Sequence, residues 1–277
     1  MRADGTASRA GGHVRRHACW SYDDPAEFAT AAATFLADGL ASGLRVWYVA
    51  ADADDGVAAQ VPGFDDARRR GSARVLSVST GHPAGVIDPV ALVETYARAT
   101  ADALADGYAG LRVATDVTPL VRTAGQVDAV ARYEHLIDEY MVANPFTALC
   151  AYDRRQLDRW DLAQLACLHP EADDDSTLFR LHACRTELGA AALAGEVDIA
   201  ARELFPLALR RVQPAVRDGR VVVDASDLNF IDHRGLLALG AYARDRGAVA
   251  VLRTPSSVPG RVIEMLGLPD VCTEPVP

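Results

Sequence analysis

Apolar positions along the chain recur with two periods, one typical of strands and the other of helices. The run Leu44 to Ala50 is short and almost continuously apolar, as in a buried parallel strand, and Gly110 to Val117 is a further predicted strand. The segments Val90 to Ala105 and Gln126 to Val142 instead place their apolar residues on one helical face. Strands that alternate with helices predict an α/β fold with a mainly parallel sheet.

Less regular apolar patterns predict further strands and helices and indicate two separate units in the chain. They predict strands over 14–20, 73–78 and 146–152 and helices over 25–40 and 158–168. An acidic run without periodicity, 171–176, then precedes a smaller α/β unit. There we expect strands over 178–183, 188–193, 221–223 and 248–253, and helices over 199–212, 232–246 and from 262. The prediction is a disordered leader (1–12), a first unit (13–170), a linker (171–176) and a second unit (177–277) with a four-stranded sheet.

Charge and cysteine content narrow the function. The formal net charge of −10 argues against a nucleic acid or an anionic membrane as partner, because neither attracts an acidic surface. No apolar run has the length of a membrane span, and the first residues lack the hydrophobic core of a secretory signal. The 5 cysteines are scattered and form no CxxC pair, which fits a reducing compartment. We therefore expect a cytoplasmic protein.

Several short sequences of the first unit carry a family resemblance. They are His17 to Asp23, Phe35 to Leu40, Leu111 to Val113, Tyr133-Glu134, Leu149 to Asp153 and His169-Pro170. With them, this unit is similar to a MEDS domain, a sensory module associated with methanogen and methylotroph regulators. The resemblance implies a RecA-like α/β fold that is not known for ATP hydrolysis. It also makes a pocket for a small organic ligand plausible.

The residues themselves also argue against ATP hydrolysis. A RecA-like ATPase needs GxxxxGK[ST] between its first strand and first helix, so that backbone N–H groups surround the phosphates. Here that place holds Ser21-Tyr22-Asp23-Asp24-Pro25, with no glycine, no lysine and two carboxylates that would repel phosphate. We expect neither an enzyme of this type nor a nucleotide cofactor.

A set of chemically active side chains is predicted to line the first unit's ligand site. The carboxyl ends of parallel strands form the usual ligand crevice, and these residues could converge there. The set is His17, Cys19, Tyr22, Arg112, Asp116, Glu134, Cys150, Tyr152 and His169. Three interpretations stay open: a pocket for a small organic molecule, a metal or redox site, or simple packing. No local spacing enforces metal geometry, so we assign no metal and no cofactor.

Two finer interpretations concern individual side chains. A Cys/His hydrolase would use Cys19 or Cys150 with His17 or His169, but the sequence contains no G-x-S-x-G or G-x-C-x-G elbow. Arg112 lies between apolar neighbours, where a buried cation requires a partner, and Asp116 or Glu134 could supply it. A structural ion pair is the favoured role for Arg112.

The second unit contains a strand, a polar loop and a helix start within Val221 to Leu239. Asp232 is placed to cap a helix that begins with His233-Arg234-Gly235. Physical reasoning alone predicts an ordinary βα turn there, although a helix N-terminus also suits an anion or a partner's acidic group.

Together with Ala194 to Asp198 and MLGLPDV from Met265, this stretch resembles a STAS domain, the fold of anti-sigma-factor antagonists. The resemblance implies binding to an anti-sigma factor or a related kinase-like regulator. The loop expected to bind this partner contains Asp227, Asn229, Asp232, His233, Arg234 and Gly235.

One departure from the STAS pattern bears on regulation. Regulated members carry D-S-[ST]-G, and the hydroxyl residue before the glycine is phosphorylated, which ejects the partner. Here Asp232 and Gly235 match, whereas His233 and Arg234 replace the hydroxyl residues. We therefore predict a sensory regulator whose partner-binding surface is not switched off by phosphorylation at this site.

Overall fold

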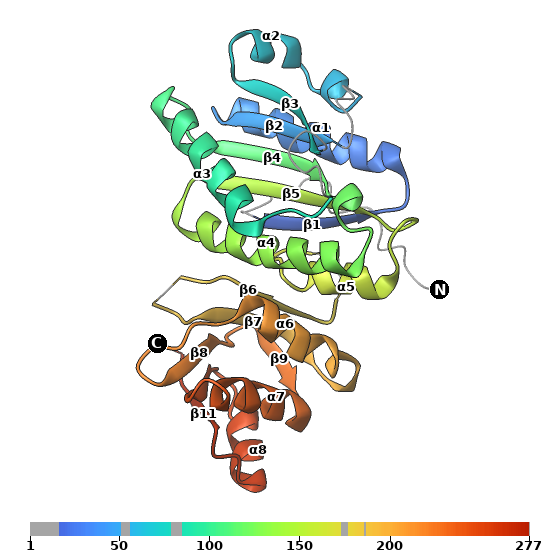
Figure 1. Cartoon of the computed structure of the whole chain (residues 1–277). Coiled ribbons are helices and arrows are strands. Elements are labelled where there is room, and N and C mark those ends of the chain that lie inside the picture. The colour runs from blue at the N-terminus through green and yellow to red at the C-terminus, as the bar shows by residue number, and fades with distance from the viewer. Residues whose placement is uncertain (1–16, 51–55, 79–84, 173–176, 186, 277) are drawn as a thin grey trace, which may run out of the picture.

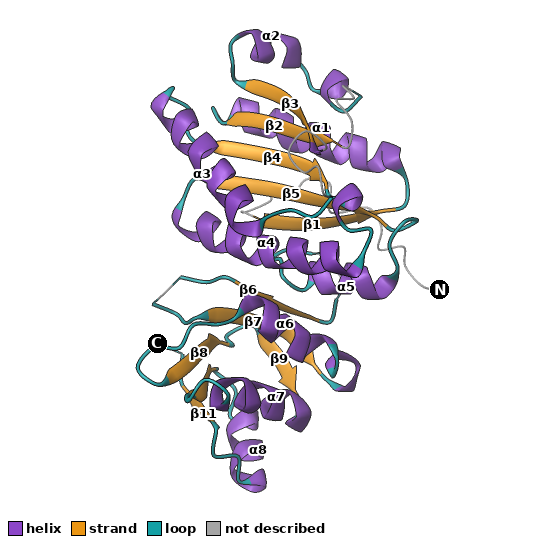
Figure 2. Cartoon of the chain, in the orientation of Figure 1, coloured by secondary structure: helices purple, strands orange, loops and turns teal. Residues whose placement is uncertain are grey.

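The computed structural model describes residues 17–50, 56–78, 85–172, 177–185 and 187–276. Two β-sheets, each covered by helices, follow one another along the chain (Figures 1 and 2). The α/β class predicted from the hydrophobic pattern is confirmed. The predicted leader lies outside the described residues, as do residues 173–176 of the predicted linker.

The first sheet is entirely parallel, with strand order β1-β5-β4-β2-β3. Its strands are β1 (His17–Tyr22), β2 (Arg45–Ala50), β3 (Ala73–Ser77), β4 (Leu111–Asp116) and β5 (Phe146–Asp153). Its helices are α1 (Pro25–Ala41), α2 (Phe64–Arg69), α3 (Pro89–Ala105), α4 (Ala124–Ala143) and α5 (Arg159–Ala166), with short 3₁₀ turns η1 (Ala58–Gln60) and η3 (Thr118–Leu120). Every strand and helix predicted for this unit is present.

Helix starts in the first unit follow from local chemistry. Asp24 and Asp88 cap α1 and α3 by accepting hydrogen bonds from backbone N–H groups of the first turn, and a proline follows each cap. Proline suits this position because its missing N–H would have no partner within the helix. The caps therefore fix the residue at which each of these helices begins.

The two faces of this sheet pack against different helices. Alternate residues of a strand point to opposite faces. On β5, Leu149 and Ala151 join the apolar cluster that includes Phe28 and Leu36 of α1. Cys150 and Tyr152 point the other way, towards α3, α4 and α5. In Figure 1, α1 lies behind the sheet and α3 and α4 lie in front of it. Cys150 and Tyr152 can therefore contribute only to a site on the face covered by α3, α4 and α5.

Among the described residues the second sheet has six strands, so the four-stranded prediction is wrong. Its strand order is β11-β10-β8-β7-β6, and β9 also pairs with β7. The strands are β6 (Phe179–His182), β7 (Ala191–Val197), β8 (Arg220–Asp224), β9 (Leu228–Ile231), β10 (Val249–Arg253) and β11 (Val271–Glu274). β9 and β11 are the unpredicted strands. Each has only 4 residues, and two exposed residues in β9 interrupt the apolar pattern.

The helices of the second unit also differ from the sequence prediction at their starts. They are α6 (Leu204–Val212), α7 (His233–Arg244) and α8 (Val258–Leu266). The helix expected from Ile199 begins instead with a separate 3₁₀ turn, η4 (Ile199–Ala201), capped by Asp198. α8 begins four residues before the predicted Val262, with Pro259 in its first turn. α7 has the predicted cap, since Asp232 accepts from the Gly235 N–H at 2.8 Å.

The two units are packed together by α4 and α5 on one side and by α6 and β6 on the other. Their buried apolar residues form one continuous cluster. Arg211 of α6 donates to Asp128 of α4 and to Gln164 of α5. Backbone N–H groups of β6 and its end donate to the Cys167 carbonyl and the Asp138 carboxylate. The predicted linker also starts inside the first unit, because the Cys19 N–H donates to the Glu171 carbonyl.

No helix in the described part of the chain combines the length and apolar character needed to cross a bilayer.

Candidate functional site

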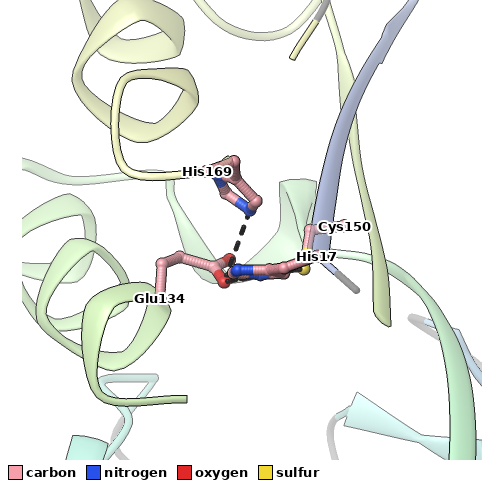
Figure 3. Close-up of side chains that lie close together, drawn as sticks. All are labelled: His17, Glu134, Cys150 and His169. Atoms are coloured by element: carbon pink, nitrogen blue, oxygen red, sulfur yellow. Dashed lines mark hydrogen bonds and ion pairs between the residues drawn. The ribbon is translucent and has the colours of Figure 1, made fainter. Parts of the chain in front are cut away.

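Four side chains meet in a fully buried cluster beneath α4 and α5 (Figure 3). His17 comes from the start of β1, Cys150 from the middle of β5, Glu134 from α4, and His169 from the segment just after α5. One potential ligand atom of each lies within 4.8 Å of those of the other three. We refer to these four residues as the buried cluster.

Glu134 is the centre of the buried cluster. Its Oε2 lies 3.1 Å from His17 Nε2, 3.5 Å from Cys150 Sγ and 3.5 Å from His169 Nε2. The Cys150 sulfur is also 3.5 Å from His17 Nε2. The second oxygen, Oε1, accepts a hydrogen bond of 2.7 Å from the Tyr152 hydroxyl. Tyr152 therefore fixes the rotation of the carboxylate and directs Oε2 at the other three residues.

The two histidines are held by groups outside the buried cluster. His169 Nδ1 lies 3.0 Å from the Leu165 carbonyl oxygen, which can only accept, so Nδ1 carries the proton. His17 Nδ1 lies 3.4 Å from Asp138 Oδ1. The two imidazole rings are 4.1 Å apart between centroids. These contacts turn the Nε2 atom of each ring towards Glu134.

Burial governs the protonation of the cysteine and of one histidine. It raises the pKa of the Cys150 thiol to about 12, with the Glu134 charge acting in the same direction. It lowers the pKa of His169 to about 4, assisted by His17. Cys150 is consequently a thiol and His169 a neutral imidazole at neutral pH when nothing is bound. A buried thiol of this kind is a poor nucleophile, which disfavours the Cys150 hydrolase interpretation.

His17 and Glu134 form the charged pair of the buried cluster. Burial alone would lower the pKa of His17, but Cys150, followed by Asp138 and Glu134, outweighs it and the pKa is raised. Burial would raise the pKa of Glu134, but the histidines and the Tyr152 hydroxyl outweigh it and the pKa is lowered. Burial would likewise raise the pKa of Asp138, but the contact with His17 outweighs it and that pKa is also lowered. The His17 ring therefore lies between two buried carboxylates, Glu134 and Asp138.

A cavity of about 460 Å³ lies beside the buried cluster, between the sheet and α3. Its walls are mostly apolar and aromatic, and Cys150 is one of its lining residues. The aromatic side chains that line it are Trp47, Tyr96, Tyr133 and Phe146. A volume of this size suits a small, largely apolar ligand. Cys150 thus belongs both to the buried cluster and to the cavity wall.

The structure brings together only part of the set predicted from the sequence. His17, Glu134, Cys150, Tyr152 and His169 converge. Cys19 is buried on the same face of β1 but supplies no ligand atom to the buried cluster.

Tyr22, Arg112 and Asp116 belong to the opposite face of the sheet. The Tyr22 hydroxyl donates to Asp116. Arg112 donates to the Phe35 carbonyl and to Thr147, so neither pairing predicted for it, with Asp116 or with Glu134, is made. Its guanidinium also lies over the Phe35 ring.

The buried cluster does not lie at the sheet edge where the sequence placed it. The buried cluster lies under the helices against the sheet face, not in a crevice at the carboxyl ends of the strands. At that edge, Asp153 is occupied by hydrogen bonds from Arg155 and Gln156. Asp24 fills the N-terminus of α1, where a nucleotide-binding loop would lie. The 28 Lys-plus-Arg residues are all arginine, so the chain lacks the lysine that a P-loop directs at the phosphates.

Sequence reasoning missed Asp138 and the aromatic cavity wall. Asp138 follows Glu134 by four residues on a helix, so the two carboxylates share one face of α4. That spacing was a usable signal, because carboxylates on the buried face of a helix require partners.

The predicted partner-binding loop of the second unit is largely exposed. Asp227, Asn229, His233 and Arg234 are exposed, and Asp232 is partly buried as a helix cap. Gly235 is buried, and a Cβ there would lie 2.7 Å from Ile231 and 2.8 Å from Val197. Glycine is required at this position because α7 approaches β7 and β9 so closely.

Comparison with known families identifies the first unit. The model of the MEDS family, described as "MEthanogen/methylotroph, DcmR Sensory domain", matches residues 16–170, more than half of the chain. The chain belongs to the MEDS family. The match covers all five strands of the first sheet and every member of the buried cluster. A sensory role for this unit follows from the family. A comparison with curated proteins found no match.

Proposed function

We propose that the protein is a signal-transduction regulator in which the MEDS unit binds a small organic molecule and the second unit binds a protein partner. The observation that carries the first half is the apolar cavity of about 460 Å³ beside the buried cluster. Its aromatic walls would enclose an apolar body, and Ser77, Thr95 and Thr115 supply polar groups that can orient it.

The second half rests on the resemblance of the second unit to STAS domains. Its partner would be an anti-sigma factor or a related kinase-like regulator. The exposed loop residues Asp227, Asn229, His233 and Arg234 lie next to the exposed apolar side chains Phe230 and Leu237. Apolar groups with a polar rim are typical of protein-binding surfaces. The −10 net charge supports a protein rather than a nucleic acid as the partner, and a cytoplasmic location is part of this proposal.

The contacts between the units provide the route from ligand to partner. α4 carries Glu134 of the buried cluster, and it also carries Asp128, Arg132 and Asp138, which bond to the second unit. A ligand that displaced α4 would therefore change both the buried cluster and the interface. We propose no catalytic step.

Two measurements on the full chain test this function. Thermal unfolding in the presence of small neutral organic molecules should show stabilisation that grows with ligand concentration and saturates. A pull-down from native lysate, analysed by mass spectrometry, should recover a kinase-like regulator, and Phe230→Asp should abolish its recovery. Absence of any saturable ligand, together with hydrolytic turnover that Cys150→Ala removes, would support the enzyme alternative instead.

A further inference from the structure

His169 Nε2 is a buried nitrogen that faces a carboxylate oxygen. Its ring is oriented by Nδ1, which lies 3.0 Å from the Leu165 carbonyl oxygen. The Nε2 atom is fully buried and has no hydrogen-bond partner among the described residues. It faces Glu134 Oε2 at 3.5 Å. A buried polar nitrogen without a hydrogen-bond partner is costly, and a cation bound between it and the carboxylate would satisfy both atoms.

We infer that His17, Glu134, Cys150 and His169 form a four-ligand site for a divalent transition metal, with Zn²⁺ as the best match. Two imidazole nitrogens, one carboxylate oxygen and one sulfur are ligands that Zn²⁺ accepts. Metal–ligand bonds of about 2.0–2.3 Å in a tetrahedron place neighbouring ligand atoms roughly 3.3–3.6 Å apart. Four separations in the buried cluster are 3.1, 3.5, 3.5 and 3.5 Å, close to those edges.

The groups around the four ligands are those that metal sites use as outer partners. A metal-bound histidine typically donates its other N–H to a carboxylate or to a backbone carbonyl. His17 Nδ1 faces Asp138 and His169 Nδ1 faces the Leu165 carbonyl. Tyr152 holds the Glu134 oxygen that does not face the site. The four ligands thus come from separate elements, and outer contacts orient His17, His169 and Glu134.

Charge balance agrees with this assignment. Glu134 and Asp138 are two fully buried carboxylates, and no arginine is paired with either of them in the described part of the chain. A bound Zn²⁺ would compensate the negative charge of these carboxylates and of the Cys150 sulfur. Because Cys150 also lines the cavity, a molecule bound there would contact a metal ligand.

The first test is metal uptake by the full chain. Protein purified without a metal-affinity resin and dialysed against a chelator is titrated with Zn²⁺ by calorimetry, and bound metal is measured by elemental analysis. We expect one ion per chain and a higher unfolding temperature. Wild-type protein that takes up no metal under these conditions overturns the inference, whatever the variants do.

The second test identifies the ligands with Co²⁺ as a spectroscopic probe. Thiolate-bound Co²⁺ gives a sulfur-to-metal charge-transfer band, and tetrahedral Co²⁺ gives strong visible bands. Cys150→Ala should remove the charge-transfer band, and Glu134→Gln and His169→Asn should each weaken binding by at least about 10-fold.

Cys19→Ala is the matched control, because Cys19 is buried and pairs in register with Cys150 on the neighbouring strand. The sulfur-to-metal charge-transfer band of the Co²⁺-loaded Cys19→Ala variant should equal that of the wild type. A band that survives in Cys150→Ala, or that is lost in Cys19→Ala, contradicts the assignment. Circular dichroism verifies that each variant is folded. This test is independent of the organic ligand and the protein partner, so the metal site and the proposed function can fail separately.

Discussion

The Tyr152 hydroxyl donates a 2.7 Å hydrogen bond to Glu134 Oε1, and this bond sets which carboxylate oxygen faces the two histidines and Cys150. Both side chains are fully buried, and each comes from a different element, β5 and α4. Tyr152 is therefore a positioning residue for the buried cluster.

Tyr152→Phe should weaken the buried cluster without emptying the space that the ring fills. The lost bond leaves Glu134 Oε1 unsatisfied, so we expect a loss of about 1–2 kcal/mol in the free energy of unfolding. Metal affinity should fall about 10-fold, as for other outer partners of metal ligands. Urea denaturation and Co²⁺ titration measure the two effects. Tyr22→Phe, on the other face of the sheet, is the control and should leave Co²⁺ affinity unchanged.

Ala91→Trp should block the ligand cavity from its rim. Ala91 lies on α3, is exposed, and lines the cavity, so a large ring there can cover it without disturbing the core. We expect thermal stabilisation by small organic molecules to disappear. Ala101→Trp, an exposed position of the same helix that does not line the cavity, should bind as wild type does. Equal ligand binding by both variants would place the organic site elsewhere.

Asp153→Asn should lower stability in a pH-dependent way. Hydrogen bonds from Arg155 and Gln156 hold the pKa of the buried Asp153 carboxyl below its usual range. A depressed carboxyl pKa stabilises the fold above about pH 4, and this contribution is lost as the pH falls below that value. The variant should therefore be about 1–3 kcal/mol less stable at pH 7. The difference should shrink on acidification, which urea unfolding at several pH values would show.

Arg211→Ala should weaken the contact between the two units. The Arg211 side chain is 9% exposed and bonds to Asp128 and Gln164, although Asp128 is partly screened by solvent. We expect a loss of about 1–3 kcal/mol. Arg210→Ala removes the exposed neighbour on the same helix and should change stability by less than about 0.5 kcal/mol. Equal effects of the two substitutions would show that the Arg211 contacts contribute little.

Arg234→Ser should create a phosphorylatable site in the second unit. It restores a hydroxyl directly before Gly235, at an exposed position of the first turn of α7. Incubation with a kinase-like anti-sigma factor and ATP should then add one phosphate, detected by intact-mass spectrometry. Wild-type chain phosphorylated in the same loop would contradict the prediction that His233 and Arg234 remove the switch.

Hydrophobic periodicity was sufficient to predict the first sheet, because strands such as β2 and β5 are almost fully buried and α1, α3 and α4 are long. It was insufficient for β9, where Asn229 and Phe230 are exposed and only Leu228 and Ile231 are buried. Residue chemistry identified all four members of the buried cluster. It failed for Arg112 and Asp116, because sequence alone did not reveal which face of the sheet β4 presents them to. Alternate residues of β4 face α1 or the opposite helices. Which set faces α1 is fixed only when the strand is placed in the sheet.

Asp138 has one oxygen towards His17 and the other in a 2.8 Å hydrogen bond from the backbone N–H of Ala183, at the end of β6. A single carboxylate therefore belongs to both units. Thermodynamic linkage is reciprocal: if occupancy of the buried cluster changes the affinity of the second unit for its partner, partner binding changes affinity at the buried cluster by the same factor. The affinity of the buried cluster for its occupant would then depend on whether the partner is bound. The isolated chain would respond to a different concentration of that occupant than the complex does.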